Sequence, residues 1–154
     1  MMNKDITYIT GNENIIDDIK ELWEGLNRHH LEKSRDFKHH FENFTFQKRK
    51  ESLINKSKNG EIYIVIAVHM GCNIGYCVSS AVNSVGEIES IYIKPEYRKC
   101  RVGTALMESS LKWIKANNTN RIILGVAAGN EEAFGFYSKF GFVPVSTKLQ
   151  YILD

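Results

Sequence analysis

The sequence has no apolar run close to the roughly 20 residues that a helix needs to cross a bilayer, so we expect no contact with a membrane. No apolar stretch follows the polar start at residues 1–5, and no signal peptide is expected. Cysteine is scarce, because Cys72, Cys77 and Cys100 make an odd count without a CxxC pair. This pattern predicts free thiols in a reducing compartment, which favours a cytoplasmic protein.

An excess of charge of one sign is also missing. The 20 basic and 18 acidic side chains leave a formal net charge of +2, and no long basic run is present. This balance does not predict a nucleic-acid partner. No repeat, low-complexity segment or linker divides the chain, so residues 1–154 are predicted to form a single domain.

Metal ligands in a convincing arrangement are lacking as well. Four of the five histidines occur as two adjacent pairs, His29-His30 and His39-His40. Neighbouring side chains on a helix point in different directions, and no cysteine or carboxylate completes either set. We therefore predict no metal site.

Hydrophobic periodicity divides the chain into a mainly helical first part and a second part that begins with strands. Helices are predicted over 15–26, near 37–43, over 46–57, over 102–116 and over 130–139, and strands over 6–9, 62–68, 74–82, 87–93 and 122–126, with a last strand or hairpin over 143–153. The three consecutive strands from residue 62 to residue 93 are joined by short turns and are predicted to be antiparallel. The predicted fold class is α+β, with a mixed sheet and helices on both faces.

The stretch from Gly86 to Leu106 has the pattern of an anion-binding site. A strand ends at Lys94-Pro95, a basic loop follows at residues 98–101, and a helix begins near Gly103. The first backbone N–H groups of a helix lack intrahelical partners, and the helix dipole adds positive potential at that end. The two arginines and the lysine of the loop strengthen this field.

A second stretch, Asn130 to Phe142, follows the apolar strand at 122–126, and the two stretches together resemble the GNAT superfamily of N-acetyltransferases. Arg98, Gly103 and Ala105 fit the family's Arg/Gln-x-x-Gly-x-Gly/Ala loop, and Asn130, Ala133, Phe136, Tyr137, Gly141 and Phe142 fit its later Asn…Phe-Tyr…Gly-Phe pattern. The first glycine of the family's loop is Arg101 here. The resemblance covers roughly the C-terminal half of the chain and implies a mainly antiparallel sheet of six to seven strands.

The resemblance also implies acetyl-CoA as co-substrate, with no metal. The pantetheine arm would pair with the strand backbone, and the pyrophosphate would lie on the basic loop and the helix start. The implied binding residues are Ile91, Tyr92, Ile93, Arg98, Lys99, Cys100, Arg101, Val102, Gly103, Thr104, Asn130 and Phe136. Cys100 has no neighbouring base that would make it a nucleophile, so we expect direct transfer in a ternary complex.

Two proton-transfer roles follow from the resemblance and from the chemistry of amine acetylation. Strand alternation places Glu87, Glu89, Ile91 and Ile93 on one face. A carboxylate there can take the proton of an ammonium group, and Glu89 is the predicted base, with Glu87 or a water molecule as alternatives. Tyr137 is the predicted acid, because a phenol stays protonated at neutral pH and can donate to the leaving sulfur.

The acceptor is less constrained by the sequence. The resemblance places the strand residue Glu87 at the mouth of the acceptor site, and the family's N-terminal helices form part of that site, so Glu87, Glu24 and His30 are predicted to contact substrate. The primary prediction is a small-molecule amine, with polyamine-like amines slightly favoured by Glu89. The alternatives are a peptide or protein N-terminal acetyltransferase and a non-catalytic acyl-CoA sensor on the same fold. Many members of the family dimerise, so a homodimer is among the expected assemblies.

Overall fold

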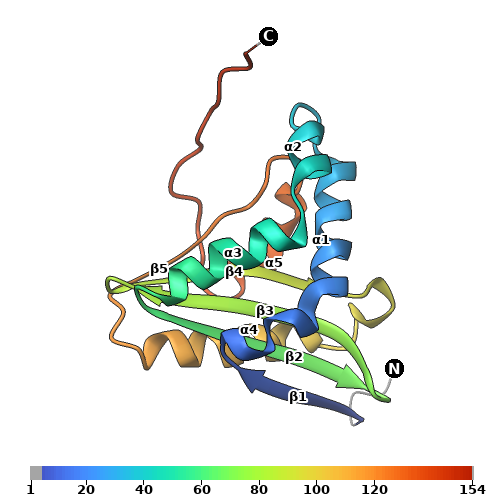
Figure 1. The fold of residues 1–154 in the computed structure, drawn as a ribbon, viewed down its shortest axis with the longest axis vertical. Helices are drawn as coiled ribbons and strands as arrows, with labels where there is room; N and C mark the ends of the chain where they lie inside the picture. Colours follow the sequence, from blue (N-terminus) through green and yellow to red (C-terminus); the bar gives the residue numbers. More distant parts are fainter. Residues whose placement is uncertain (1–4, 154) are drawn as a thin grey trace.

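The computed structural model describes residues 5–153 and centres on a five-stranded mixed sheet (Figure 1). The strands lie in chain order, with β1 at Ile6–Gly11, β2 at Glu61–His69, β3 at Cys72–Val82, β4 at Val85–Ile93 and β5 at Arg121–Leu124. The first four strands are antiparallel neighbours, and β5 pairs with β4 in parallel. The predicted α+β class and antiparallel β2–β3–β4 unit are therefore confirmed.

The predicted count of six to seven strands is wrong for the described residues. The segment 143–153, predicted as a strand or hairpin, forms no strand, and all of its side chains are exposed. In Figure 1 it runs away from the sheet as a single extended tail. Without a neighbouring strand its backbone has no ladder partner, so the apolar pattern alone was not sufficient to form a strand.

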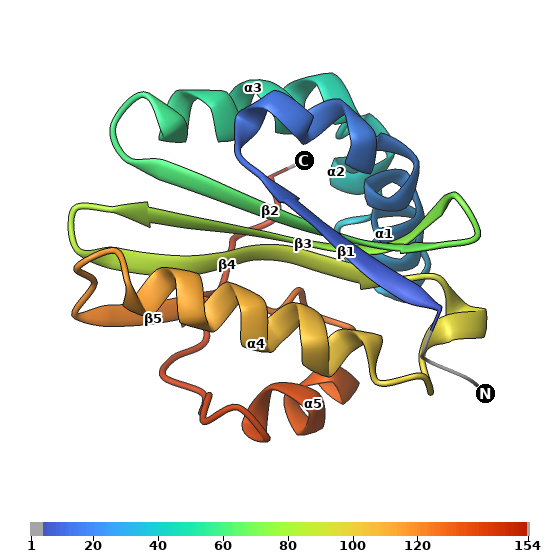
Figure 2. The same ribbon diagram turned by 90° about the horizontal axis from the view of Figure 1, so that it is seen from below.

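Helices cover both faces of the sheet (Figure 2). They comprise the 3-10 helix η1 at Glu13–Ile19, α1 at Lys20–Lys33, α2 at Lys38–Asn43, α3 at Phe46–Ser57, the 3-10 helix η2 at Pro95–Tyr97, α4 at Val102–Lys115, the 3-10 helix η3 at Glu131–Ala133 and α5 at Phe134–Ser138. In Figure 2, η1, α1 and α3 lie on one side of the sheet, and α4 and α5 lie on the other. The Asn12 side chain caps η1 by accepting a hydrogen bond from the Asn14 N–H at 2.9 Å.

The core has two halves, one on each side of the sheet. On the α1 and α3 side, Leu22 and Trp23 pack with Leu53 and strand residues that include Ile64. On the α4 side, Leu106 and Ile114 are fully buried against the other face of the same strands. Strand β2 is apolar almost throughout because helices cover both of its faces.

A β-bulge at Glu89 changes which side chains share a face of β4. Val78 of β3 lies opposite Ser90, whereas the next residue, Ser79, lies opposite Ile88, so Glu89 is the extra residue. The predicted alternation, which grouped Glu89 with Ile91 and Ile93, is therefore wrong. Ile91 and Ile93 pack on the α4 side, whereas Glu89 points to the α3 side.

The pairing of β4 with β5 stops just before the bulge. The last pair is Ile88 with Leu124, and β5 ends there. Among the described residues no strand pairs with this edge of β4 beyond Ile88. A bulge bends its strand and increases the local twist, which explains why β4 leaves β5 at this point.

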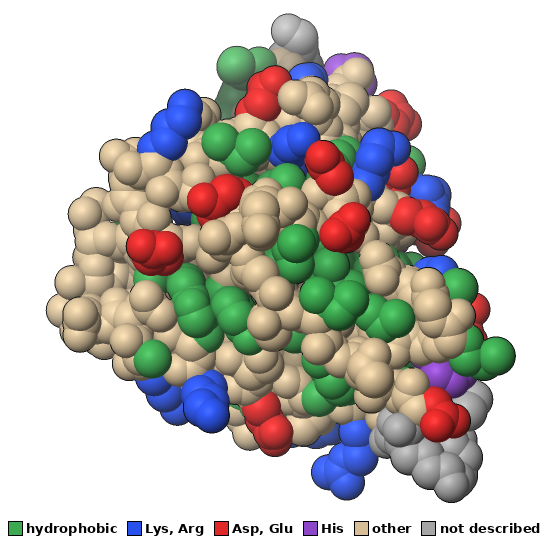
Figure 3. All heavy atoms as spheres, turned by 60° about the horizontal axis from the view of Figure 1, so that its bottom comes forward, with side chains coloured by type: hydrophobic (Ala, Val, Ile, Leu, Met, Phe, Trp, Pro, Cys, Tyr) green, Lys and Arg blue, Asp and Glu red, His purple; other side chains and the backbone are tan. Residues whose placement is uncertain are grey.

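The surface carries charges of both signs. On the face seen in Figure 3, hydrophobic side chains lie across the middle, with acidic and basic groups around and between them. In the part of the chain that the structure describes, no helix is both long and apolar enough to cross a membrane.

The close contact between Gly86 and α4 gives a first testable prediction. A Cβ atom at Gly86 would overlap the Ile114 side chain, which is fully buried. We expect Gly86→Ala to lower the free energy of unfolding by about 1–3 kcal/mol, as overpacking does in other cores. Urea unfolding measures this. The control is Gly135→Ala, since no atom lies within 4 Å of a Cβ there; equal effects of the two substitutions would contradict the packing argument.

Candidate active site

A small cavity of about 70 Å³ lies where β4 leaves β5. Helix α1 contributes Leu26 and His30, and β4 contributes residues 88–91. The end of β5 and the loop after it contribute residues 124–127 and Asn130, and α5 contributes Tyr137. Five predicted site residues therefore line one cavity: His30, Glu89, Ile91, Asn130 and Tyr137. The lining by Leu26 and by residues 124–127 was not predicted, because no chemical motif marks these positions.

Tyr137 is positioned by an aromatic cluster on α5 and the segment that follows it. Its ring centroid lies 5.3 Å from that of Phe136 and 6.3 Å from that of Phe142, both with the rings near edge-to-face. No hydrogen bond joins its hydroxyl to another side chain in residues 5–153. Burial, with a smaller effect of the Cys77 thiol, raises the pKa of Tyr137 to about 12. The phenol is thus protonated at neutral pH, as the predicted acid must be.

Glu89 lies at the centre of a buried ion-pair network that was not predicted. Its side chain is 4% exposed. Arg49 donates from Nη2 to Oε1 at 3.3 Å and to the Glu89 carbonyl oxygen at 3.1 Å, while the Ser80 hydroxyl donates to Oε2 at 2.6 Å. Lys56 also donates to Oε2. Both carboxylate oxygens therefore have hydrogen-bond donors, and two cations compensate the buried charge.

Lys56 links Glu89 to Glu87. Its ammonium group lies 2.9 Å from Glu87 Oε1. Desolvation of Lys56 opposes its charged form, but the hydrogen bonds that it donates to Glu89 and Glu87 outweigh this and raise its pKa. A sequence signal for this network did exist, because Arg49, Leu53 and Lys56 are spaced for one face of α3 and Leu53 is buried.

The predicted substrate residues lie in different surroundings. His30 lines the cavity, and Glu87 is held by Lys56 outside it. Glu24 pairs with Lys20 at 3.0 Å on the surface of α1 and does not line the cavity. The sequence could not separate these positions, since all three lie on elements that border the same region.

Asn130 joins the loop after β5 to α1. Its Oδ1 lies 3.1 Å from His29 Nε2, which fits a His29 tautomer that carries its proton on Nε2. The Asn130 N–H also donates to the Ala127 carbonyl at 3.0 Å, which closes a turn. His29 is therefore a positioning residue for this loop, a contact that the sequence pattern did not reveal.

The basic loop leads directly into α4. Arg101 precedes the first residue of the helix with φ 60° and ψ 18°, in the left-handed region where the resembled family has glycine. Gly103 lies in the first turn, where an added Cβ would be 3.1 Å from Phe136 and 3.2 Å from Ile93. The backbone of the helix start is thus close to the unpaired end of β4. The first N–H groups of a helix lack intrahelical partners, so here they are available beside that strand end.

Some of the other predicted cofactor residues have exposed side chains, and others are buried. Arg98 donates from Nε to the Ile93 carbonyl at 3.0 Å, and its guanidinium carbon lies 5.4 Å from the centre of the Tyr92 ring. Lys99 is exposed, Thr104 is half-buried, and Cys100 and Val102 are buried. The side chains of Cys100 and Val102 therefore contribute to the core, and only their backbone could contact a ligand.

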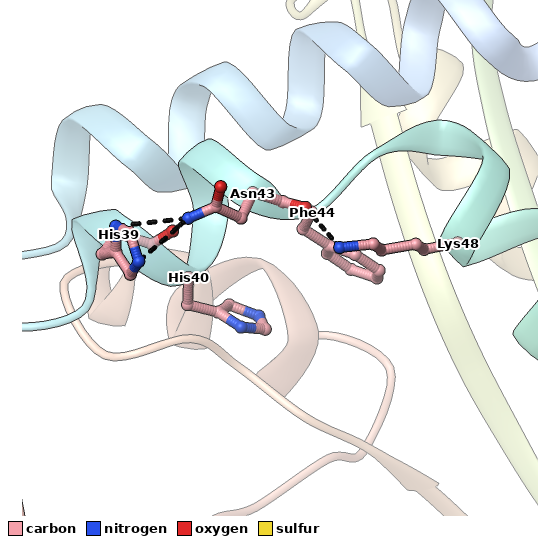
Figure 4. Close-up of a pocket in the computed structure, with 5 residues that line it drawn as sticks. All are labelled: His39, His40, Asn43, Phe44 and Lys48. Atoms are coloured by element: carbon pink, nitrogen blue, oxygen red, sulfur yellow. Dashed lines mark hydrogen bonds between the residues drawn. The ribbon is translucent and has the colours of Figure 1, made fainter.

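A second, larger pocket of about 360 Å³ lies on α2 and the start of α3 (Figure 4). It is lined by His39, His40, Asn43, Phe44 and Lys48. Figure 4 shows Asn43 bonded to His39 and Lys48 bonded to the Asn43 carbonyl, so these polar groups are already paired. None of the predicted site residues lines this pocket. Within residues 5–153, no three His, Cys, Asp or Glu side chains form a group that could hold a metal ion.

The backbone at Arg101 gives a second prediction. A left-handed conformation costs a non-glycine residue about 1–2 kcal/mol, so Arg101→Gly should be more stable than Arg101→Ala by about 1 kcal/mol in chemical unfolding. Lys99 is the control, since it is exposed and does not have positive φ. There the alanine variant should equal or exceed the glycine variant. If the alanine variant is at least as stable as the glycine variant at position 101 too, the backbone at Arg101 is not strained.

The network around Glu89 gives a third prediction. Arg49→Leu removes the donor to Oε1 and the donor to the Glu89 carbonyl. We expect a loss of about 1.5–3 kcal/mol in the free energy of unfolding, as for buried hydrogen bonds to charged groups. Arg35→Leu should change stability by less than about 0.5 kcal/mol, because its side chain is 92% exposed. If Arg49→Leu lowers the free energy of unfolding by no more than Arg35→Leu does, then Lys56 and Ser80 alone are enough to stabilise the buried Glu89 carboxylate.

Comparison with known proteins relates this chain to acetyltransferases. A ribosomal protein bS18-alanine N-acetyltransferase of Bacillus subtilis, described as putative, is 36% identical over 80 residues, which are 52% of this chain and 53% of that protein. An N-alpha-acetyltransferase of Sulfurisphaera tokodaii is 34% identical over 70 residues, 45% of this chain and 42% of that protein. The chain thus spans about half the length of the curated relatives that it matches.

A solved structure and a family model extend the likeness to most of the chain. The PaiA N-acetyltransferase of Thermoplasma acidophilum, solved in complex with coenzyme A, has the same fold with a TM-score of 0.72 at 20% identity, covering 93% of this chain and 92% of that one. The model of the acetyltransferase (GNAT) family matches residues 17–142, which include the cavity and the start of α4. The chain belongs to the acetyltransferase (GNAT) family.

Proposed function

We propose that this protein transfers an acetyl group from acetyl-CoA to a primary amine, directly and within a ternary complex. The observation that carries the proposal is the position of Tyr137. Its protonated hydroxyl group belongs to a cavity that also borders the unpaired part of β4. Acetyl-CoA supplies the activated acetyl thioester.

Two parts of the chain would hold the co-substrate. The N–H groups at the start of α4 and the basic side chains of residues 98–101 favour a pyrophosphate. The edge of β4 beyond Ile88 has no strand partner among the described residues, so its backbone groups are available to an extended chain such as pantetheine. The close approach of Gly103 to Ile93 and Phe136 brings the two parts together.

The chain's own groups then manage the protons. Tyr137 donates to the sulfur that leaves, and its pKa of about 12 means that it holds this proton at neutral pH. Glu89, the base predicted from sequence, lines the same cavity. To accept a proton it would first have to release a hydrogen bond from Arg49, Ser80 or Lys56, and this opposes its action as a base.

For the acceptor we favour the α-amine of a peptide or protein N-terminus over the small polyamine-like amine. Glu89 supported the polyamine prediction, but Arg49 and Lys56 compensate its charge, and Lys56 also pairs with Glu87. The two carboxylates therefore offer little free negative charge to a polycation. Two relatives named for ribosomal protein alanine and N-alpha acetylation support the same choice.

The alternative is a non-catalytic acyl-CoA sensor. Such a protein needs the α4 start and the β4 edge but has no need for a protonated phenol in the cavity. The presence of Tyr137 there favours the enzyme. The two functions differ in one measurement, since a sensor binds acetyl-CoA without turnover on any amine.

A fourth prediction tests this function. Release of free CoA should depend on acetyl-CoA and an amine, and a panel of short peptides, polyamines and aminoglycosides should show turnover on one class, with peptides expected. Tyr137→Phe should lower kcat by about one to two orders of magnitude, because the sulfur loses its proton donor. Tyr151→Phe is the control, since that side chain is 84% exposed on the tail. Full activity of Tyr137→Phe would exclude the acid role, and binding without turnover would favour the sensor.

A further inference from the structure

One polar group in the cavity has no partner and no role in the chemistry described so far. His30, on α1, lines the cavity together with Glu89, Asn130 and Tyr137. Its Nδ1 atom is buried, and no hydrogen bond joins it to any residue in 5–153. Such an unpaired buried nitrogen is costly unless a ligand or substrate uses the ring.

We propose that His30 accepts the proton of the acceptor amine and is thus a further catalytic residue. This inference rests on the proposed acetyl transfer. A base must be able to reach the cavity and must have a free lone pair. Of the two candidates that line it, His30 forms no side-chain hydrogen bond within residues 5–153, whereas both oxygens of Glu89 already accept hydrogen bonds. Because Nδ1 of His30 is enclosed by protein, the proton is accepted on Nε2.

The surroundings of His30 keep it neutral and therefore able to accept a proton. Burial, and to a lesser extent the neighbouring His29, lowers its pKa. The Phe41 ring of α2 lies 5.5 Å from the His30 ring and contributes no charge. The titratable groups that share the cavity are Tyr137, which is protonated at neutral pH, and Glu89, whose charge is compensated by Arg49 and Lys56.

This base suits one class of amine better than another. A peptide α-amine has a pKa of about 7.7–8.0 and a lysine-like amine one of about 10.4, against about 6.5 for an unperturbed imidazole. Proton transfer to an unperturbed imidazole is therefore unfavourable by about 20-fold for the α-amine and by almost 10⁴-fold for the lysine-like amine, and the lowered pKa of His30 makes both transfers less favourable. The difference lies in the amines themselves, and with His30 as base the N-terminal α-amine gives up its proton more readily than the lysine-like amine.

The step balances in atoms and charge. An N–H bond of the ammonium breaks and an N–H bond to the His30 ring forms, which leaves a neutral amine and a cationic imidazole. The amine nitrogen bonds to the acetyl carbon while the C–S bond breaks, and the sulfur takes the Tyr137 proton. The second proton of the amine nitrogen then restores the Tyr137 phenol, and His30 releases its proton to solvent.

The test compares variants on a short peptide with a free N-terminus and acetyl-CoA, over about pH 5–9. We expect His30→Gln to lower kcat/KM by about 10²-fold and to remove the acidic limb of the pH profile, and added imidazole to restore part of the rate. Glu89→Gln should keep that limb. His39→Gln is the matched control and should match the wild type, since its side chain is 91% exposed and outside the cavity.

Three results would overturn the inference. If the wild-type protein turns over and His30→Gln keeps its acidic limb, His30 is not the base, while the proposed function stands. The second result does not depend on a folded variant: the acidic limb of the wild type should coincide with the titration of the His30 ring followed by NMR, and a mismatch excludes His30. If the wild-type protein acetylates no amine at all, the proposed function fails, and the role of His30 fails with it.

Discussion

The β-bulge at Glu89 is the constraint on which the site depends. It follows directly after the last pair of β4 with β5, so the two strands separate where the extra residue bends β4. The cavity with Tyr137 and His30 lies at this separation. The bulge also turns Glu89 toward α3 and leaves Ile91 and Ile93 on the α4 side. One inserted residue therefore determines both the opening in the sheet and the side chains that border it.

The bulge leaves the Glu89 carboxylate in a buried position, where its charge has to be stabilised. A carboxylate that is 4% exposed is unfavourable unless it is paired and hydrogen-bonded. Arg49 and Lys56 of α3 and Ser80 of β3 meet that need. The contacts of Arg49 and Lys56 with Glu89 also hold α3 against β4, on the face of the sheet that α3 covers. In this arrangement Glu89 stabilises the bend, and its proton-accepting capacity is reduced by the same contacts.

The start of α4 shows the same combination of local strain and tertiary support. Arg101 takes a left-handed conformation that glycine adopts at no steric cost. The helix that it opens is firmly held, because Val102, Leu106 and Ile114 are fully buried against the sheet. This packing keeps the free N–H groups of the first turn beside the end of β4, where an anion would be bound.

The sequence by itself determined the elements and the motif residues. Periodic apolar positions predicted nearly every helix and strand, and the two motif stretches placed Tyr137, Asn130 and Glu89 among the site residues, because these signals are local in the chain. His30 was placed there only by the family's use of its N-terminal helices. Only the tertiary structure decided the bulge, the neutralisation of Glu89 by Arg49 and Lys56, the contact of Asn130 with His29, and the exposed tail at 143–153. Each of these depends on which distant segments lie side by side. A strand pattern does not contain that information, since a shift of one residue in register reverses every side chain that follows it.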